Sequence, residues 1–439
     1  MSTSIEAIVG STDLSWQWDF YRGLHGHPEL SGQEEWTAAQ IVAQLAAYDA
    51  TVMDHIGGHG IVAIFTNGDP KDSDTTVLLR ADIDALPVVE TTGADYASKN
   101  GNMHACGHDM HITALLGLCA ILDANRDKWR GTVIALFQPA EENGSGALAM
   151  LDDGLVGRIP RPDVFLAQHI IPGPAGTVFS KEGPTLAGSD SIEIIVHGRS
   201  AHGSMPHTAI DPTYVAAMIV VRLQGIVGRE IPPSEFAVAS VGTLDAGHSN
   251  NIIPGEARIV VNCRTYDESV RERLNAAIER VVRAECAASG VTAEPTIRYF
   301  AHAPITNNSA EVFARVRSEF DAVFGANSQD AREWTASEDF TNIPRAYGDA
   351  GRDSSLYWFV GCTPVDQWEA AAAAGTLERT IPVNHSGEFL PDFSPTVRAC
   401  TMAAASAVFA YVGTEGSGPF RIGAGTFRCS GIRFSSHRS

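Results

Sequence analysis

The chain has 439 residues, more than one hydrophobic core usually organises, so two domains are expected. Its 52 acidic residues outnumber the 31 Lys and Arg residues, and the resulting formal charge of -21 argues against nucleic acid or an anionic membrane surface as a partner. An apolar fraction of 44% with 19% charged residues is typical of a globular protein and excludes a chain that is disordered throughout.

The sequence shows no sign of export or of membrane insertion. Residues 1–16 contain no basic segment followed by an apolar stretch, and no apolar run approaches the roughly 18 residues of a membrane span. The seven cysteines are an odd number without regular spacing, which fits a reducing compartment better than a disulfide framework. We therefore expect a cytoplasmic protein.

Short apolar runs that end in polar side chains are the main feature of residues 1–185. After a helical pattern over residues 16–48, apolar runs at 76–79, 133–137 and 164–167 each stop at acidic, amide or histidine side chains. This pattern is typical of buried strands in a mostly parallel sheet, and ligands gather beyond the carboxyl ends of such strands. The three endings are expected to converge on one site.

Residues 186–303 have a different pattern and are predicted to form an inserted second domain. Strands and helices are expected in the order strand, helix, strand, strand, helix, strand, which is the ferredoxin-like α+β arrangement. These elements are predicted at residues 191–197, 212–225, 237–242, 257–263, 268–288 and 292–300.

The first domain is predicted to resume over residues 304–412. A helix is expected at 308–325, a strand at 355–360 and a helix at 395–412, for which Ser394 is the predicted N-cap. The predicted fold is therefore α/β, with a central, mostly parallel sheet flanked by helices.

Residues 413–439 are rich in Gly, Ser and Arg and show no periodicity. This composition is typical of a mobile tail.

Residues 104–111 form the densest group of metal-binding side chains. Cys106 and His108 precede the apolar positions of a predicted helix, whose N-terminus favours a thiolate. Cysteine with histidine is a ligand pair suited to Zn or a similar metal. Taken alone, the same group could be a helix cap with a buried thiol.

Glu141 and Glu142 are adjacent carboxylates that follow a strand expected to be buried. Two like charges are costly there without a nearby cation. One carboxylate can bind a metal while its neighbour takes a proton from water, as metal-assisted hydrolysis requires. A Glu-Glu pair without such a strand is usually a solvated surface.

Two further histidines complete a candidate ligand set. His169 follows the apolar run at 164–167 and His385 lies between Asn384 and Ser386, and each taken singly would more often be structural. Together the candidates are five protein ligands, more than one catalytic zinc with an open water position needs, so two metal ions fit the number better. The set is Cys106, His108, Glu142, His169 and His385.

Eight motifs, in order along the chain, resemble the acyl-amino-acid amidohydrolase branch of the dinuclear metal exopeptidases, which includes hippurate hydrolases, N-acyl-amino-acid aminoacylases and auxin-conjugate hydrolases. The resemblance runs from about residue 16 to residue 412. It is carried by residues 25–30, 80–87, 104–111, 138–142, 198–207, 251–254, 337–340 and 384–389.

The resemblance implies a zinc-exopeptidase-like fold and roles for individual residues. The five candidate ligands match the family's metal ligands, for two divalent ions that could be Zn, Mn, Co or Ni. Glu141 matches the general acid/base, and Asp84 resembles the acid behind the metal site. His202 is expected to reach the active site of a partner subunit and polarise the scissile carbonyl, which implies a homodimer formed through the inserted domain.

Asn251 and Arg264 match positions suited to holding the substrate carboxylate or carbonyl, and Arg is the natural residue for bidentate carboxylate recognition. The alternatives are an Asn in a turn and an Arg on a solvated strand face.

The chain departs from the family pattern at two places. Ala201 and the Gly203-Ser204 pair flank His202 where a glycine and a small residue are common, and Gly387 follows Ser386 where proline is common. These departures concern the shape of the pocket and the acyl group, because they leave every candidate ligand in place.

The implied activity is hydrolysis of the amide bond of N-acyl amino acids, a small-molecule substrate class. A dipeptidase or carboxypeptidase with the same metal chemistry is the alternative. Cys106 favours the acyl-amino-acid branch, because the peptidase branches usually carry a metal-bridging Asp in that region. A non-catalytic homologue would be expected to lack a ligand or the base, and none is missing here.

Overall fold

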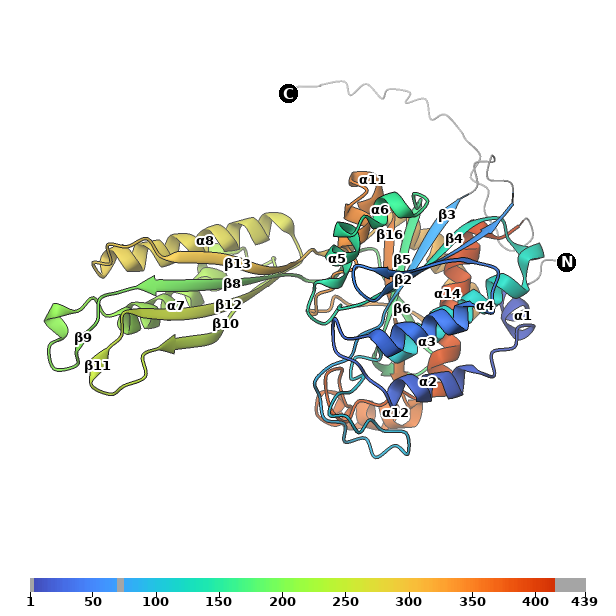
Figure 1. Cartoon of the computed structure of the whole chain (residues 1–439), viewed down its shortest axis with the longest axis horizontal. Coiled ribbons are helices and arrows are strands. Elements are labelled where there is room, and N and C mark those ends of the chain that lie inside the picture. The colour runs from blue at the N-terminus through green and yellow to red at the C-terminus, as the bar shows by residue number, and fades with distance from the viewer. Residues whose placement is uncertain (1–3, 69–74, 415–439) are drawn as a thin grey trace, which may run out of the picture.

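The computed structural model describes residues 4–68 and 75–414, which form a large lobe and a slender small lobe that extends from it (Figure 1). Nearly all of the predicted tail at 413–439 lies outside the described residues. Within the described ranges, none of the helices has the length and apolarity needed to cross a membrane.

An eight-stranded sheet runs through the large lobe, in the order β1-β2-β4-β3-β5-β16-β6-β15. The central strands β4, β3, β5 and β16 are parallel to one another, as the sequence predicts. The strands are β1 (Thr51–Ile56), β2 (Gly60–Asn67), β3 (Thr76–Asp82), β4 (Gly131–Gln138), β5 (Val164–Pro174), β6 (Val178–Ser180), β15 (Ser328–Asp330) and β16 (Ser355–Thr363).

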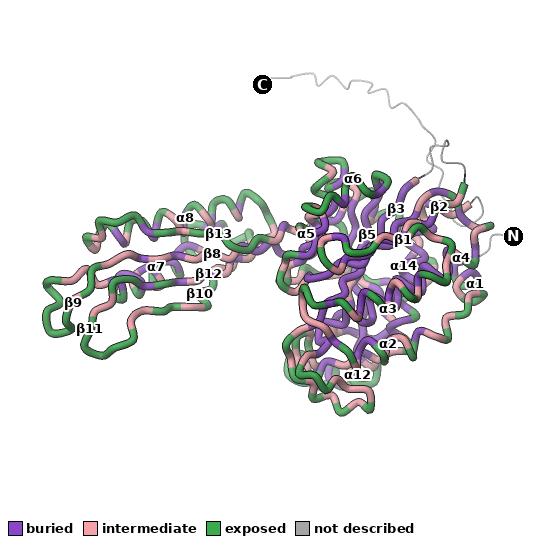
Figure 2. Tube along the Cα trace, viewed as in Figure 1, coloured by how far each residue is buried: buried purple, intermediate pink, exposed green. Residues whose placement is uncertain are grey.

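Helices cover both faces of this sheet, so alternate residues of one strand enter different cores. In β3, Val77 and Leu79 belong to one hydrophobic cluster and Leu78 to the other. The first cluster contains residues of α1 (Ile5–Gly10), α2 (Gln17–His25), α3 (Glu35–Leu45), α4 (His108–Ala124), α9 (Ala310–Phe324) and α14 (Phe393–Val412). The second contains residues of α5 (Gly146–Asp152), α6 (Leu155–Arg158) and α10 (Asn342–Arg345). The α/β fold class is therefore confirmed, and both faces of the strands that lead to the candidate site are buried (Figure 2).

The small lobe contains a four-stranded antiparallel sheet in the order β10-β12-β8-β13. Its elements follow the predicted ferredoxin-like order: β8 (Gly188–His197), α7 (Pro212–Glu230), β10 (Ala237–Ala246), β12 (Glu256–Thr265), α8 (Glu268–Ala288) and β13 (Thr296–Ala303). Alternate apolar residues of β8 and β12 join α7 and α8 in a separate core. The short strands β9 (Ala201–His202) and β11 (Ile252–Ile253) pair with each other at the tip farthest from the large lobe (Figure 1).

Several predicted boundaries are wrong by a few residues, and two of these differences have a local reason. The last strand of the small lobe begins at Thr296 instead of residue 292, because Pro295 has no N–H for the sheet ladder. Helix α14 begins at Phe393 with Asp392 as its N-cap, so Ser394 is not the cap. Proline is tolerated in the first turn of a helix, and Pro395 therefore did not fix the starting residue.

Candidate metal centre and active site

The candidate site lies at the carboxyl ends of β3, β4 and β5. Asp84 follows β3, whose last residue is Asp82, and the Glu141-Glu142 pair follows β4 after two intervening residues. His169 does not follow its strand as predicted, because β5 continues to Pro174. Beyond Ala167 the strand no longer pairs with β3 but keeps pairing with β16, so His169 still lies at the same end of the sheet.

Cys106 and His108 lie where the chain enters α4. His108 is the first residue of the helix, and Gly107 before it has φ 83°, a left-handed conformation suited to glycine. A Cβ on Gly107 would lie 2.3 Å from Ile170 Cδ1. The loop can therefore place both ligand candidates against β5 only with glycine at this position.

The loop that carries His385 is fixed by backbone contacts. His385 N donates to Ala105 O at 2.8 Å, and Thr91 N donates to Gly387 O at 2.7 Å. A Cβ on Gly387 would lie only 2.5 Å from Val89 O. This close approach explains why a proline would not fit at Gly387.

The five predicted ligands are brought together. Cys106 Sγ lies 3.4 Å from His169 Nε2 and 3.3 Å from His385 Nε2. Glu142 Oε2 lies 3.3 Å from His385 Nε2, and Glu142 Oε1 lies 3.7 Å from His108 Nε2. Two ligands bound tetrahedrally to one ion at ordinary zinc distances lie about 3.3–3.6 Å apart. The spacings therefore fit shared divalent cations.

Unpartnered buried atoms point to the same conclusion. Among the described residues, His108 Nε2 and Glu142 Oε1 are buried without a hydrogen-bond partner. His108 Nδ1 is held by Asp84 Oδ1 at 3.1 Å, and His169 Nδ1 donates to Ile170 O at 2.7 Å. Nδ1 of each imidazole is thus engaged, and Nε2 faces the other ligand candidates, an arrangement in which the second nitrogen orients a metal-binding histidine.

The protonation properties of these groups also fit a bound cation. Burial, with the charges of Glu142 and Glu141, raises the pKa of the Cys106 thiol well above its usual range. Burial would lower the pKa of His108, but Asp82, Asp84 and Glu142 raise it to about 10. A divalent ion favours the thiolate and the neutral imidazole, so it would resolve both conflicts.

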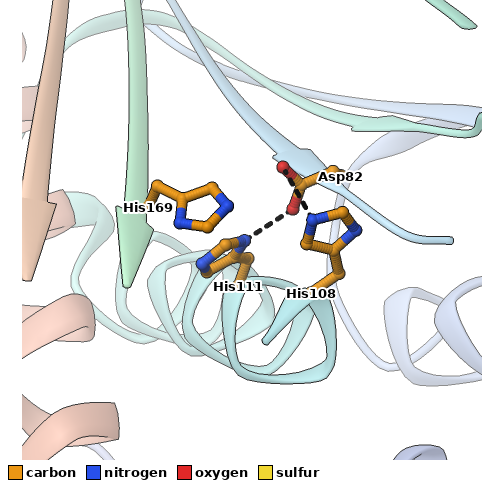
Figure 3. A group of neighbouring side chains, drawn as sticks. All are labelled: Asp82, His108, His111 and His169. Atoms are coloured by element: carbon orange, nitrogen blue, oxygen red, sulfur yellow. Dashed lines mark hydrogen bonds and ion pairs between the residues drawn. The ribbon is translucent and has the colours of Figure 1, made fainter. Parts of the chain in front are cut away.

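The ligand candidates His108 and His169 also form a cluster with Asp82 and His111, which Figure 3 shows. His111 comes from α4, and its Nδ1 lies 2.5 Å from Asp82 Oδ1 while its Nε2 accepts from Ile170 N at 2.9 Å. Both nitrogens of His111 are therefore engaged, and it has no lone pair left for a metal. We interpret His111 and Asp82 as groups that hold β3, α4 and β5 together at the site.

A buried charge network lies beside Glu141. The Arg80 guanidinium pairs with Glu338 at 2.8 Å and with Asp82 at 2.6 Å, and all three side chains are almost completely buried. Carboxylate oxygens of Glu141, Glu338 and Asp339 lie within 4.8 Å of one another. Burial, and then the charges of Glu338, Glu142 and Asp339, raises the pKa of Glu141 well above its usual range, while Arg80 opposes this effect. Glu141 therefore has a high affinity for a proton, a property of a general acid/base.

Sequence reasoning assigned no role to Arg80, Asp82, His111 or Glu338. Arg80 and Asp82 had a usable signal, because they continue a strand that is apolar up to that point and a buried charge must be paired. The partnership of Arg80 with Glu338 joins residues 258 positions apart, and no local pattern indicates it.

The three predicted site residues of the small lobe, His202, Asn251 and Arg264, do not lie together. His202 and Asn251 are exposed at the tip, where Gly203 N donates to Asn251 O at 2.7 Å and His202 Nδ1 lies 2.8 Å from Ser204 Oγ. Arg264 lies at the other end of the sheet and donates to Ser337 Oγ at 3.0 Å, next to Glu338. Within one chain, the tip is far from the strand ends of the large lobe (Figure 1).

The sequence of this chain is similar to those of known peptidases and hydrolases. Residues 78–368 match peptidase family M20/M25/M40. The hippurate hydrolase of Campylobacter jejuni is 38% identical over 320 residues, which are 72% of this chain and 82% of that protein. Thermostable carboxypeptidase 2 of Saccharolobus solfataricus is 34% identical over 382 residues, 86% of this chain and 91% of that protein.

The chain is also similar to a solved structure of a metal-binding protein. A dinuclear metal-binding peptidase of the M20 family from Bacillus subtilis superposes with a TM-score of 0.72 at 27% sequence identity. The match covers 91% of this chain and 98% of that protein.

Proposed function

The chain belongs to peptidase family M20/M25/M40, and on that premise we propose that it hydrolyses the amide bond of N-acyl amino acids with two divalent metal ions. The products are a carboxylic acid and a free amino acid. The observation that carries the proposal is the convergence of five donor side chains, two of which present buried atoms without a hydrogen-bond partner among the described residues.

Cys106, His108, Glu142, His169 and His385 would hold the ions. When bound, two divalent cations would supply Lewis acidity to polarise the substrate carbonyl and to acidify a water molecule. Asp84 fixes the ring of His108 through Nδ1 and accepts the Glu142 N–H at 3.0 Å, so one carboxylate orients two ligands.

Glu141 acts as the general acid/base in this proposal. It lies next to a ligand candidate but is not one itself. Burial and the neighbouring carboxylates raise its pKa, which makes its carboxylate a strong proton acceptor. It takes the proton from the water that attacks the amide carbonyl and then gives it to the leaving amine. The proton therefore ends on the amino acid product, and Glu141 returns to its starting state.

His202 and Asn251 would serve the site of a second copy of the chain, in a homodimer. Support comes from their exposure at the small-lobe tip and from exposed apolar residues on the same lobe. On α7, Tyr214 is 60% exposed and Val221 is 63% exposed, and Leu244 of the edge strand β10 is 48% exposed. Exposed apolar surface of this kind is typical of an interaction site. The imidazole of His202 would then polarise the scissile carbonyl.

A carboxypeptidase or dipeptidase is the second candidate. It is favoured by the relative named as a carboxypeptidase, which matches 86% of this chain. Both activities need a group for the substrate carboxylate, and Arg264 is the candidate because it lies at the junction of the lobes beside Ser337. The two activities differ in whether the acyl side carries an amino group.

We also propose that the protein is located in the cytoplasm. The support for this location is the state of six described cysteines, which are all buried and unpaired, as expected in a reducing compartment.

The test is hydrolysis of N-acetyl, N-benzoyl and longer N-acyl amino acids alongside dipeptides, after chelation and re-addition of single metals. We expect amine release that disappears with the chelator, returns with Mn, Zn or Co, and is faster for N-acyl amino acids than for dipeptides. Faster release from dipeptides would support the second candidate. No release with any metal, from folded protein that binds two ions, would contradict both.

A further inference from the structure

The turn that presents Glu141 and Glu142 begins with a residue in an unfavourable backbone conformation. Ala140 has φ 50°, in the left-handed region that side chains with a Cβ rarely adopt. Because Ala140 directly precedes Glu141, its conformation sets the direction in which the chain carries both carboxylates. A change to the ordinary right-handed conformation would redirect both side chains and break the hydrogen bond from Glu142 N to Asp84.

The two backbone polar groups of Ala140 are held on opposite sides. Its carbonyl oxygen accepts from Gly146 N at 3.0 Å and from Ser145 N at 3.2 Å, both within the same loop. Its N–H donates to Glu34 Oε1 at 2.8 Å, in a buried contact between residues 106 positions apart. Glu34 is therefore the contact that ties this turn to another part of the fold.

The buried Glu34 carboxylate also lies near the backbone N–H groups of Gly32 and of Glu34 itself, but its contact with Ala140 is the one that reaches a distant segment. Glu34 is completely buried and precedes α3 as its N-cap residue, yet it makes no capping hydrogen bond. Glu29 accepts from the first backbone N–H groups of α3 instead, at 3.1 Å from Trp36 N and 2.8 Å from Thr37 N. Burying a carboxylate is costly, and one of the hydrogen bonds that offset this cost joins Glu34 to the turn that carries Glu141.

The same segment also contacts the acid behind the metal centre. Ser31 Oγ donates to Asp84 Oδ2 at 2.7 Å, and the same Asp84 oxygen accepts from Glu142 N. Residues 31–34 thus hold the 139–142 turn at both ends, through Ser31 and Asp84 at Glu142 and through Glu34 at Ala140.

We propose that Glu34 is a positioning residue that holds Ala140 in its left-handed conformation and thereby fixes the orientation of Glu141 and Glu142. This inference rests on the proposed function for its effect on turnover, and on geometry alone for its effect on the turn. What matters is an acceptor oxygen at the right distance, so Gln in place of Glu34 should serve and a side chain without such an oxygen should not.

The experiment compares Glu34→Met, Glu34→Asp and Glu34→Gln with wild-type full-length protein. Met has a similar length but no comparable acceptor, Asp keeps the charge but is one methylene too short, and Gln keeps the acceptor oxygen. We expect Glu34→Met and Glu34→Asp to lower kcat by about 10- to 100-fold at saturating Mn²⁺, with KM changed by no more than about twofold. We expect Glu34→Gln to stay within about threefold of wild type.

A second readout needs no substrate. Because Glu142 lies in the same turn, Mn²⁺ affinity measured by chelator competition should fall by about tenfold in Glu34→Met and Glu34→Asp. Glu35→Met, a change at the exposed neighbour, should alter neither quantity. Glu29→Met should lower the melting temperature by removing the α3 cap and leave kcat per folded molecule unchanged.

Wild-type kcat and Mn²⁺ affinity in both Glu34→Met and Glu34→Asp would overturn the inference. So would a Glu34→Gln variant as defective as Glu34→Met, because the charge would then matter instead of the acceptor. If Glu34→Met does not fold, Glu34→Asp alone decides. If wild-type protein hydrolyses no amide but the affinity losses occur, the proposed function fails and the role of Glu34 stands.

Discussion

The strand ends of the large lobe and the tip of the small lobe carry the two parts of the candidate site, and they differ in how far the chain completes them. At the strand ends, His108 is completely buried and one of its nitrogens is fixed by Asp84. At the tip, His202 is exposed, and among the described residues its ring has a hydrogen bond only with its neighbour Ser204. A group that must act on a desolvated carbonyl gains little while it is surrounded by water.

Under the proposed function, one chain supplies all the ligands of the metal centre, whereas the proposed carbonyl-polarising His202 would act on the site of a second chain. The large lobe orients its ligands with its own carboxylates and backbone. The small lobe carries His202 on a short pair of strands, where it is exposed, so the proposal requires a second copy of the chain to enclose it. The following changes test the two halves separately.

The largest effect is expected from the large lobe. Glu141→Gln removes the proton acceptor but keeps the size of the side chain, so turnover should fall by at least about 100-fold. Metal analysis should still find two ions per chain, because Glu141 is not a proposed ligand. Glu388→Gln, an exposed change near His385, is the control and should retain activity. Near-normal turnover in Glu141→Gln would refute its assignment as the base.

His202→Ala should lower kcat by about 100-fold, from the loss of one stabilising donor at the carbonyl oxygen. Its metal content and melting temperature should not change, because the side chain is exposed and distant from the ligands. His207→Ala, at another exposed histidine near the tip, is the matched control. Equal activity in the two variants would remove the small-lobe tip from the mechanism.

Co-expression of Glu141→Gln with His202→Ala sharpens the comparison further. In a mixed dimer, one of the two sites combines an intact Glu141 with the other chain's intact His202. Random pairing should therefore restore about a quarter of wild-type activity from two nearly inactive proteins. Activity that stays at the level of the separate variants would show that His202 does not act across a dimer.

A smaller effect is expected where the two lobes meet. Arg264→Lys keeps the charge but loses the fork that binds a carboxylate with two hydrogen bonds, so KM should rise by about tenfold with little change in kcat. Arg258→Lys, on the exposed face of the same strand, should leave KM unchanged. An unchanged KM in Arg264→Lys would identify Arg264 as a bridge between the lobes through Ser337, without a role in substrate binding.

The smallest effect concerns stability. His25 is buried between Asp109 and Glu90, and although burial lowers its pKa, these carboxylates raise it to about 9. The unfolded chain has a histidine pKa near 6.5, so the stabilisation from His25 is fully present below about pH 6.5 and is lost as the pH rises through about 9. Melting temperatures across this range should fall more steeply in wild type than in His25→Gln. Parallel curves would contradict the charged state of His25.

Much of this architecture could be predicted from local sequence patterns. Apolar runs that end in polar residues identified the strand ends, and the order of elements in residues 186–303 identified the small-lobe topology. The boundary at His169 was missed, because a polar residue can lie inside a strand that pairs on one side only. The local pattern of apolar and polar residues does not show on which sides a strand pairs with its neighbours.

Other features depend on contacts between distant segments, which a single sequence does not reveal. The Arg80-Glu338 pair and the Glu34-Ala140 hydrogen bond each join separate parts of the large lobe. The left-handed conformation of Ala140 gave no signal either, because alanine is not a residue that favours it. The predicted role of His202 came from family resemblance and not from any pattern of residues.

The central claim is that one chain holds two divalent ions and that both are needed for amide hydrolysis. The most direct test is a titration of metal-free protein with Mn²⁺ in which bound metal and hydrolysis of an N-acyl amino acid are followed in the same samples. We predict that activity rises to its maximum at two bound ions per chain. Full activity at one ion per chain, or no hydrolysis when two are bound, would contradict the account.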